Sequence, residues 1–282
     1  MAAGIWWLAS YPKSGNTWLR AVLSTITSGR PVDINAMHRL GPSADGRSPF
    51  DEALGISSAD LSLEQELNLR PRAYEVWAEA ARRPLYCKAH DASHFTPAGE
   101  PLFSAAATRG AVYVVRDPRA VAVSLAAYMA WTIDEAIAWM DDPVATSASS
   151  SRRLSHHLRI LLLRWHNHVE SWLTAPFPVH LMRYEDMLAD PHATFAAAAA
   201  FLGLPCNSDA IEAAVAETTF SRLREQEQRA GFSEKPRSAG AFFREGRADS
   251  WRQELTPEQA ARIVTAHGAT MRRLGYDTAP SR

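Results

Sequence analysis

The chain has 282 residues, of which 46% are hydrophobic and 22% are charged, and its formal net charge is −1. This length and composition predict one globular α/β domain spanning residues 1–282, with a sizeable core. The near-neutral charge gives no reason to expect a nucleic-acid partner or an anionic membrane surface. Two cysteines, Cys87 and Cys206, exclude a disulfide framework. Because the sequence has neither a membrane-length apolar run nor a secretory signal pattern, we expect a cytoplasmic protein.

Short apolar segments alternate with helical patterns along the chain. Strands are predicted at residues 5–10, 84–89, 111–116 and 178–184. Helices are predicted at residues 16–28, 72–82, 118–130, 152–174, 191–202, 209–217 and 256–274. The last of these begins with a cap residue, a first-turn proline and an acid, Thr256, Pro257 and Glu258. This alternation predicts a parallel β-sheet flanked by helices on both faces.

Three polar stretches lack clear periodicity and are predicted to be irregular. They cover residues 41–60, 142–152 and 224–241. Such segments are either mobile surface loops or the borders of a binding site, and the two descriptions are compatible.

The first predicted strand runs directly into a loop that can bind an anion. Residues 10–20 read SYPKSGNTWLR and join the strand to a helical pattern. Loop amides and a helix N-terminus attract an anion, Lys13 adds a full charge, and Ser14 and Thr17 add hydroxyl donors. The nucleotide-triphosphate pattern G-x-x-x-x-G-K-[ST] is absent, because Lys13 precedes Gly15. The alternative is an ordinary turn with Asn16 at the helix start.

A second segment places an arginine at the end of a buried strand. Residues 111–115, AVYVV, are apolar and largely β-branched, and they lead into Arg116, Asp117 and Pro118. Open α/β sheets bind ligands at the carboxyl ends of their strands, where Arg116 is expected to lie. Ser124 follows about two helical turns later. The alternative for Arg116 is a structural ion pair with Asp117 or another neighbour.

Together the two segments resemble sulfotransferases that use 3′-phosphoadenosine 5′-phosphosulfate (PAPS). In that family a Y-P-K-S-G-T-T-W loop binds the 5′-phosphosulfate, and V-x-R-[ND]-P-x-D-x-x-V-S binds the 3′-phosphate. This chain has YPKSGNTW at residues 11–18 and VRDPRAVAVS at residues 115–124. Asn16 replaces a threonine, and Ala120 replaces the common aspartate. The form of the first loop is similar to that of bacterial members, some of which tailor secondary metabolites.

Four further segments match the family in the same order. They are YCKAH at residues 86–90, MRYEDM at 182–187, TTF at 218–220 and FREGRADSW at 243–251. In the last segment Glu245 replaces a lysine and Asp249 replaces a glycine. The matches span roughly residues 5 to 275, so the resemblance implies a P-loop-like nucleotide-binding sulfotransferase fold.

The resemblance implies a set of donor-binding residues. Those at the 5′ end of the donor are Lys13, Ser14, Gly15, Asn16, Thr17 and Trp18. Arg116 and Ser124 bind the 3′-phosphate, and Arg244 and the amide of Gly246 add to that pocket. Phe220 and Trp18 pack against the adenine or, alternatively, in the core, and Tyr184 hydrogen-bonds the adenine edge. A carboxylate beside a phosphate is repulsive, so Glu245 should turn to solvent or pair with Arg247.

The resemblance also implies the catalytic residues. His90 is the candidate base, because an imidazole can accept a proton near neutral pH. Lys13 stabilises the leaving phosphate, and Lys88 contacts the transferred group or the 5′-phosphate. His94 is the rival for the base. The histidines predicted within the 152–174 helix are expected to pack or to face solvent; they are His156, His157, His166 and His168.

The expected reaction moves a sulfuryl group from PAPS to a hydroxyl or amine of a small-molecule acceptor, without a metal. One alternative is a kinase with a variant phosphate loop, which needs magnesium and acidic ligands such as Asp117 and Asp186. Another is a non-catalytic protein that binds adenosine 3′,5′-bisphosphate (PAP). Trp131 and Trp139 are candidates for the acceptor pocket. The sequence identifies neither the acceptor nor the oligomeric state.

Overall fold

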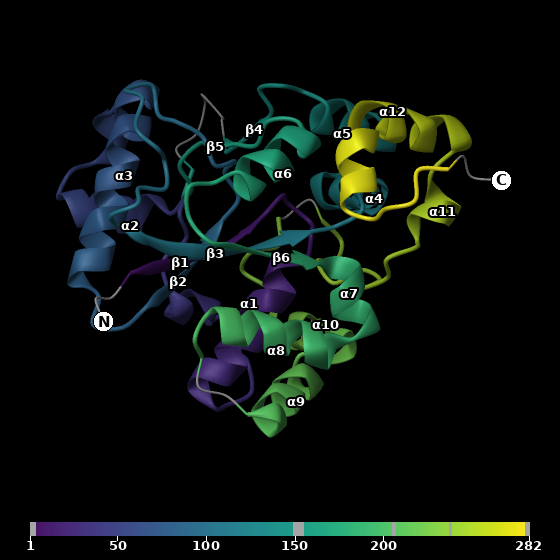
Figure 1. Ribbon diagram of the computed structural model, residues 1–282, viewed down its shortest axis with the longest axis horizontal. Coiled ribbons are helices and arrows are strands. Elements are labelled where there is room, and N and C mark those ends of the chain that lie inside the picture. Colours follow the sequence, from purple (N-terminus) through teal and green to yellow (C-terminus); the bar gives the residue numbers. More distant parts are fainter. Residues whose placement is uncertain (1–3, 149–154, 205–206, 237–238, 280–282) are drawn as a thin grey trace.

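A four-stranded parallel sheet forms the centre of the molecule (Figure 1). The structure is a computed structural model that describes residues 4–148, 155–204, 207–236 and 239–279. The strand order is β2-β1-β3-β6. The strands are β1 (Ile5–Ser10), β2 (Leu85–Ala89), β3 (Thr108–Val115) and β6 (Val179–Arg183). All four predicted strands and their parallel pairing are therefore confirmed.

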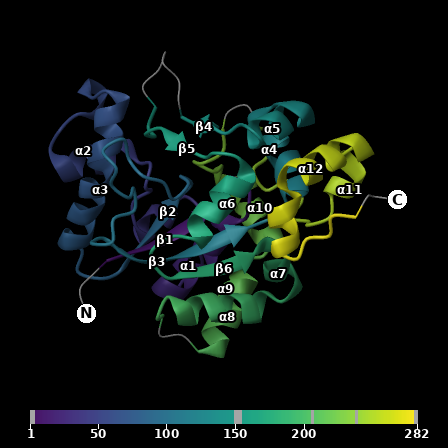
Figure 2. The same cartoon turned by 45° about the horizontal axis from the view of Figure 1, so that its top comes forward.

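Helices cover both faces of the sheet, and β1, which is apolar from Ile5 to Ala9, is buried along its whole length. Ile5, Trp7 and Ala9 face one helical layer, and Trp6 and Leu8 face the other. The first layer contains α3 (Leu63–Ala80), α4 (Pro118–Met129), α5 (Ile133–Met140), α6 (Trp165–Leu173) and α12 (Pro257–Arg273). The second contains α1 (Asn16–Ser28), α7 (Tyr184–Ala189), α8 (Pro191–Phe201) and α9 (Ser208–Glu217). Figure 2 shows α6 and α12 on one side of the sheet and α8 and α9 on the other.

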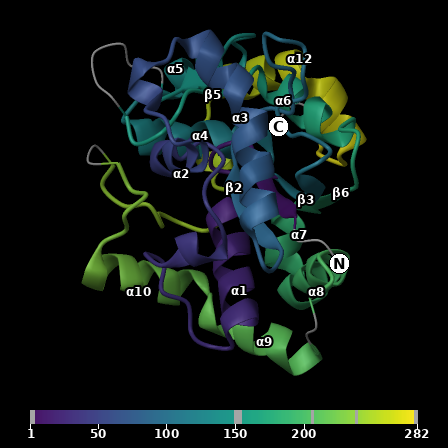
Figure 3. The same ribbon diagram turned by 90° about the vertical axis from the view of Figure 1, so that its left-hand side faces the viewer.

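Shorter elements connect these layers. They are η1 (Met37–Leu40), α2 (Arg47–Leu54), η2 (Ser58–Asp60), β4 (Thr146–Ser147), β5 (Ile160–Leu161), α10 (Phe220–Ala230) and α11 (Trp251–Glu254). Helix α10 lies beside α1 (Figure 3), and Leu223 and Ala21 share a small apolar cluster there. The segment that follows α10 is thereby held near the start of α1.

All four strands run in the same direction, but the side of β1 on which the next strand is added changes between β2 and β3. From β1 the chain proceeds to β2 on one side, and from β2 it crosses to β3 on the other side. An open α/β sheet binds its ligand outside the carboxyl ends of its strands at such a switch point. Residues 11–15 follow β1 and Arg116 follows β3, so both predicted anion-binding segments lie at this point.

Five predicted helices are confirmed to within one residue at each end; they are α1, α4, α8, α9 and α12. Helix α12 has the predicted cap, since the Thr256 hydroxyl accepts a hydrogen bond from the amide of Gln259. Helix α3 begins well before the predicted residue 72. The prediction began after Pro71, but the capping box at Ser62 starts the helix earlier and Pro71 lies inside it.

The prediction of one helix over residues 152–174 is wrong. Only residues 165–173 are helical, and residues 152–154 lie outside the described residues. The segment before α6 is extended because its backbone bonds to other loops. The amide of Leu158 donates to the carbonyl of Asp45, and β5 pairs with β4. Leu163 also adopts a positive φ of 60°, which ends any helical run.

The irregular stretches are only partly irregular. Residues 41–60 contain α2 and η2, and the stretch 224–241 begins inside α10. Residues 142–148 include β4, and the remainder of that predicted stretch lies outside the described residues. Helix α2 was missed because it has only eight residues and a single buried one, Phe50.

A buried ion pair holds the loop before α2 in place. Arg70 on α3 is fully buried and bonds both carboxylate oxygens of Asp91, at 3.0 and 2.6 Å. Its guanidinium also donates to the carbonyl of Ala44 at 3.3 Å, and the Tyr74 hydroxyl donates to the same carbonyl at 2.9 Å. Helix α3 therefore anchors residues 43–46 through the carbonyl of Ala44.

Within the described residues, no single helix is both long enough and apolar enough to span a bilayer. Helices α4 and α5 meet that requirement only as a pair, which is bent by 117°.

Candidate functional site

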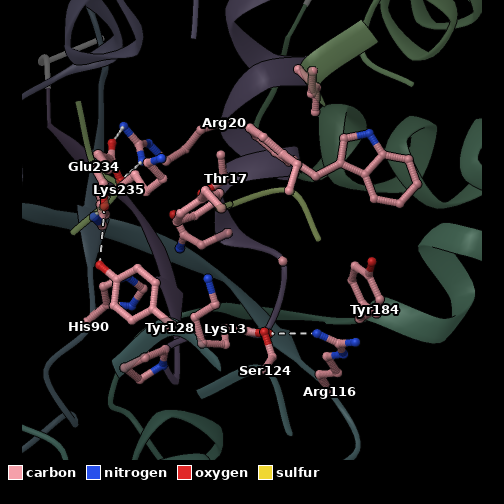
Figure 4. A pocket seen from close by; sticks show the side chains of 18 of the residues that line it. Lys13, Thr17, Arg20, His90, Arg116, Ser124, Tyr128, Tyr184, Glu234 and Lys235 are labelled. Carbon is pink, nitrogen blue, oxygen red and sulfur yellow. Dashed lines mark hydrogen bonds and ion pairs between the residues drawn. The ribbon is translucent and has the colours of Figure 1, made fainter. Parts of the chain in front are cut away.

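A pocket of about 850 Å³ lies at the carboxyl ends of the central strands (Figure 4). Thirteen of the fourteen site residues predicted from the sequence line it; they are Lys13, Gly15, Asn16, Thr17, Trp18, Lys88, His90, Arg116, Ser124, Tyr184, Phe220, Arg244 and Gly246. Ser14 is the exception, because this residue of the loop is fully buried. The structure thus brings together segments that are more than 200 residues apart in the chain.

The loop after β1 has a backbone that two residues with positive φ define. Gly15 has a φ of 109° and Lys13 a φ of 68°, and glycine is the residue that adopts such values without strain. A Cβ atom on Gly15 would lie 2.6 Å from Cδ2 of Tyr184. Gly15 is therefore required both for the turn and for the close approach of Tyr184.

Helix α1 begins at this loop with free amide groups. The amides of Trp18 and Leu19 donate to the carbonyl of Gly15, so those of Asn16 and Thr17 have no partner within the helix. The side-chain amide of Asn16 donates to the carbonyl of Leu8 at 2.7 Å and ties the helix start to β1. The helix end is thereby fixed with its positive pole toward the pocket.

Arg116 lies directly beside this loop. Its guanidinium donates to the carbonyls of Lys13 at 3.1 Å and Arg247 at 2.8 Å, and it lies 4.5 Å from the centre of the Tyr184 ring (Figure 4). The Nε atom is buried and has no hydrogen-bond partner among the described residues. The ion pair with Asp117 that was the alternative for Arg116 does not form, because Asp117 is paired with Arg119 at 2.7 Å.

Lys13 projects into the pocket between two aromatic rings. Its ammonium group lies 4.2 Å from the Tyr128 ring centre and 3.9 Å from that of Phe242. Burial, and then the nearby charges of Arg116 and Lys88, lower its pKa from the usual 10.5 to about 7. A nearby negative charge raises the pKa of Lys13 again. The charge of Lys13 therefore depends on whether an anionic ligand is bound.

His90 presents one ring nitrogen to the pocket. Its Nδ1 lies 2.8 Å from the carbonyl oxygen of Ser10, which can only accept, so Nδ1 carries the proton and Nε2 is the basic atom. Burial, and then the charge of Lys88, lower the pKa of His90 to about 4. A second histidine supports this arrangement, since Nε2 of His168 donates to the carbonyl of His90 at 3.0 Å and the Tyr113 hydroxyl donates to Nδ1 of His168.

The sequence analysis missed Glu234, which lies between two cations of the pocket. Its carboxylate pairs with Lys88 at 2.9 Å and with Arg20 at 2.7 Å (Figure 4). Burial alone would raise its pKa, but Lys88 and Arg20 together hold the pKa of Glu234 well below its usual range. Glu234 belongs to a charged stretch without periodicity, so no sequence signal distinguished it. Arg20 lies in the second turn of α1, which starts at Asn16, and it also lines the pocket.

Of the two arrangements expected for Glu245, the structure shows the exposed one. Glu245 does not pair with Arg247; it lies 3.6 Å from Arg244, and Arg247 pairs with Asp249. Arg244 bonds both oxygens of Glu254 more closely, at 3.1 and 2.7 Å. Glu254 follows Arg244 by ten residues and no motif includes it, so this second carboxylate was not foreseen.

Aromatic side chains form the side of the pocket near α8. Trp18 packs edge-on against Tyr184 and Phe195, with ring centres 6.3 and 5.4 Å apart. Phe220 lies flat against the backbone at Gly246, where an added Cβ would be 2.5 Å from its Cδ2 atom. Trp18 packs against the core and also lines the pocket.

Two further expectations about the pocket are wrong. His94, the rival to His90, does not line it, and its Nδ1 bonds the carbonyl of Phe95. Trp131 and Trp139 do not line it either. They pack edge-on with ring centres 5.7 Å apart, against the main core, because α5 turns that face toward α4.

His157 is exposed, as expected, but it does not lie on a helix and its side chain lines the pocket. Its Nδ1 lies 2.8 Å from the buried carboxylate of Asp45. The hydrogen bond that Nδ1 donates to Asp45, against the effect of burial, raises the pKa of His157 above 6.5. His157 precedes the helix rather than belonging to it, so the helical prediction concealed this position.

The carboxylates considered for a kinase do not face the pocket. Asp117 caps α4 and pairs with Arg119, and Asp186 is a half-exposed partner of Arg183. The pocket instead combines a helix N-terminus, several cations and a neutral histidine. This combination can bind a ligand with two anionic groups and can accept a proton from a third group.

A family model described as "Sulfotransferase domain" matches residues 5–275 of the chain. The chain is 25% identical over 268 residues to flavonol 3-sulfotransferase of Flaveria bidentis, which covers 91% of this chain and 78% of that protein. It is also 25% identical over 283 residues to sulfotransferase 2B1 of Homo sapiens, which covers 97% of this chain and 67% of that protein.

Solved structures share the same arrangement of elements. Mouse sulfotransferase SULT7A1 complexed with PAP matches with a TM-score of 0.59 and 18% identity, over 96% of this chain and 85% of that one. Retinol dehydratase in complex with androsterone and the inactive cofactor PAP matches with the same TM-score and identity, over 95% and 80%. The predicted α/β fold with a parallel sheet is therefore confirmed.

Proposed function

Because the chain belongs to the sulfotransferase family, we propose that it transfers a sulfuryl group from PAPS to a hydroxyl or amine of a small-molecule acceptor. Residues 1–282 would act as one catalytic domain in the cytoplasm. The residues predicted from the sequence take the roles given there, with His90 as the base and Lys13 at the leaving phosphate. Relatives named as cytosolic sulfotransferases and structural neighbours that hold PAP support this proposal.

The observation that carries the proposal is the pairing of two anion-binding groups in one pocket. Arg116 donates to the carbonyl of Lys13, so the guanidinium and the loop at the start of α1 are held side by side. Two buried donors here, Nε of Arg116 and Nε1 of Trp18, have no partner within the described part of the chain. Buried donors normally have partners, so these two fit a ligand rich in acceptor oxygens and ring nitrogens.

The chemistry follows from the positions of Lys13, Lys88 and His90. An oxygen of the acceptor forms a bond to sulfur while the bond from sulfur to the 5′-phosphate oxygen breaks and PAP leaves. Nε2 of His90 accepts the acceptor's proton, which its pKa of about 4 permits over the whole physiological range. Lys13 donates to the leaving oxygen as negative charge develops there, and Lys88 offers donors to the sulfuryl oxygens.

Calorimetric titrations with PAP, AMP and ATP test the proposal. We expect PAP to bind most tightly, because only PAP carries a 3′-phosphate. Arg116→Ala should weaken PAP binding by about 10- to 100-fold, the range for a lost hydrogen bond to a charged group, with AMP binding nearly unchanged. Arg109→Ala, at the opposite end of β3, is the control. An equal loss for AMP would contradict the assignment of Arg116, and tighter binding of ATP with a magnesium requirement would favour a kinase.

Donor binding should take up a proton at Lys13. With a pKa of about 7, Lys13 is mostly neutral at pH 7.5, and a bound phosphate makes it fully charged. We expect PAP binding at pH 7.5 to take up about 0.7 proton more in the wild type than in Lys13→Arg, which is always charged. PAP affinity of the wild type should accordingly fall as the pH rises above 7, relative to the variant.

Titrations in two buffers with different ionisation enthalpies measure this uptake. Comparison with the arginine variant removes the contribution of the nucleotide's own phosphates. Equal proton uptake in the two proteins would show that Lys13 is already charged before the ligand binds.

A further inference from the structure

A second histidine–carboxylate pair lies on the wall of the same pocket. Nδ1 of His157 is 2.8 Å from Oδ2 of Asp45, whose carboxylate is buried while the imidazole is half exposed. Nδ1 is thus committed to Asp45, and Nε2 is the ring nitrogen that remains for a ligand. The reaction derived above does not use this pair.

The backbone holds both members of the pair rigidly. The amide of Leu158 donates to the carbonyl of Asp45 at 2.7 Å, and residues 46 and 157 form an antiparallel bridge. Asp45 also accepts a hydrogen bond from the Ser43 hydroxyl on its other oxygen. Each oxygen of Asp45 thus already accepts a hydrogen bond from a neighbouring side chain, and the one from Nδ1 orients His157.

The pair lies on the β2 side of the pocket, whereas Arg116 lies on the β3 side. The amide of Ala44 donates to the carbonyl of Lys88, which attaches the Asp45 loop to the outer strand β2. Arg116 follows β3, on the other side of β1. With the nucleotide between the β1 loop and Arg116, the end next to β2 is left for the acceptor, beside His90.

The charged groups on the β2 side of the pocket can balance the charge of one more anion. Among the residues that the structure describes, the charged groups that act on His157 are Asp45, Lys88 and Glu234. Glu234 is already bonded by both Lys88 and Arg20, and Asp45 is bonded by His157 and Ser43. When His157 is protonated, the three cations Arg20, Lys88 and His157 thus lie beside only two carboxylates, which are those of Asp45 and Glu234. An incoming ammonium group would find neither carboxylate available, whereas an acid would gain a charge-assisted hydrogen bond.

We propose that His157, oriented by Asp45, binds an acidic group of the acceptor, so that the acceptor is a hydroxyl compound that also carries a carboxylate. This inference rests on the proposed sulfuryl transfer in this pocket. His157 is then a residue that determines acceptor specificity, and it acts at a distance from the oxygen that is sulfated.

Three phenols with the same ring test the inference: 3-(4-hydroxyphenyl)propionate, its primary amide and tyramine. With PAPS saturating at pH 6.5, we expect kcat/KM for the acid to exceed that for the amide at least tenfold, and tyramine to be the poorest. His157→Gln should bring the acid-to-amide ratio close to 1. His156→Gln changes the neighbouring exposed histidine, which does not line the pocket, and should leave the ratio unchanged.

The preference should also depend on pH. Because the hydrogen bond to Asp45 raises the pKa of His157 above 6.5, the imidazolium is kept to higher pH than in a free histidine and is lost as the pH rises further. The acid-to-amide ratio should therefore be largest near pH 6 and should fall toward pH 9. In the His157→Gln variant the ratio should show no such fall.

A second measurement does not depend on turnover. In protein labelled with ¹³C-histidine and saturated with PAP, the acid should shift the Cε1 signal that His157→Gln removes, and the amide should not. An acid that leaves this signal unmoved, or an acid-to-amide ratio that survives His157→Gln, overturns the inference. If the phenols are sulfated without preference, only the inference fails. If PAP does not bind at all, the proposed function fails as well.

Discussion

Replacing His90 with alanine is expected to lower turnover about 10³-fold while PAP affinity changes by less than about twofold, since a general base contributes to the reaction and little to donor binding. Nε2 of His90 is the lone basic atom that the ring offers to the pocket, because Nδ1 donates to Ser10. Its low pKa means that His90 stays unprotonated down to about pH 4. A loss of activity between pH 7 and 5 would therefore be due to the protonation of other groups.

Single-turnover assays of sulfate transfer, together with calorimetry on PAP, separate the two effects. His94→Ala is the matched control, because His94 lies four residues away and does not line the pocket. Retained turnover in His90→Ala would reject His90 as the base. A loss of PAP binding equal to the loss of turnover would show that His90 serves the nucleotide instead.

Replacing Asp91 with alanine is expected to destabilise the fold by about 3–5 kcal/mol, the usual cost of leaving one member of a buried ion pair alone. Arg70 and Asp91 are both fully buried, so the remaining guanidinium could not reach water without opening α3. The carbonyl of Ala44 depends on the same arginine, so the loop that carries Asp45 should loosen as well.

Denaturant unfolding monitored by fluorescence and circular dichroism measures this loss. Arg72→Ala removes another arginine from α3, but its pairs with Glu75 and Glu79 are exposed, and we expect a change of less than about 1 kcal/mol. A loss of similar size in the two variants would mean that burial of the Arg70 pair has no energetic consequence.

The sequence predicted the central sheet and both ends of five of the seven predicted helices because the signals there are local. β1 is buried at all six positions and apolar at five of them, and α1 and α12 begin with recognisable loop or capping residues. The position of Lys13, His90 and Arg116 in one pocket followed from where their strands end. In each case a motif and the adjoining strand or helix pointed to the same answer.

The remainder depended on contacts between distant segments. Residues 155–164 have apolar spacing that suits a helix, yet their backbone bonds to loops around residues 45 and 91. The same contacts bring His157 to the pocket, where a helix would have hidden it. Glu234 reaches Lys88 from 146 residues away, and nothing in its local sequence indicates that partner.

The single carboxylate of Glu234 forms ion pairs with both Arg20 on α1 and Lys88 on β2. Such a shared partner gives redundancy: if one cation is removed, the carboxylate keeps the other and stays in place. The effects of Arg20→Met and Lys88→Met should therefore not add, and each should understate the coupling that a double-mutant cycle reveals. Only a change at Glu234 itself releases both cations, so the contribution of Lys88 to catalysis can be isolated only in a background where that carboxylate is absent.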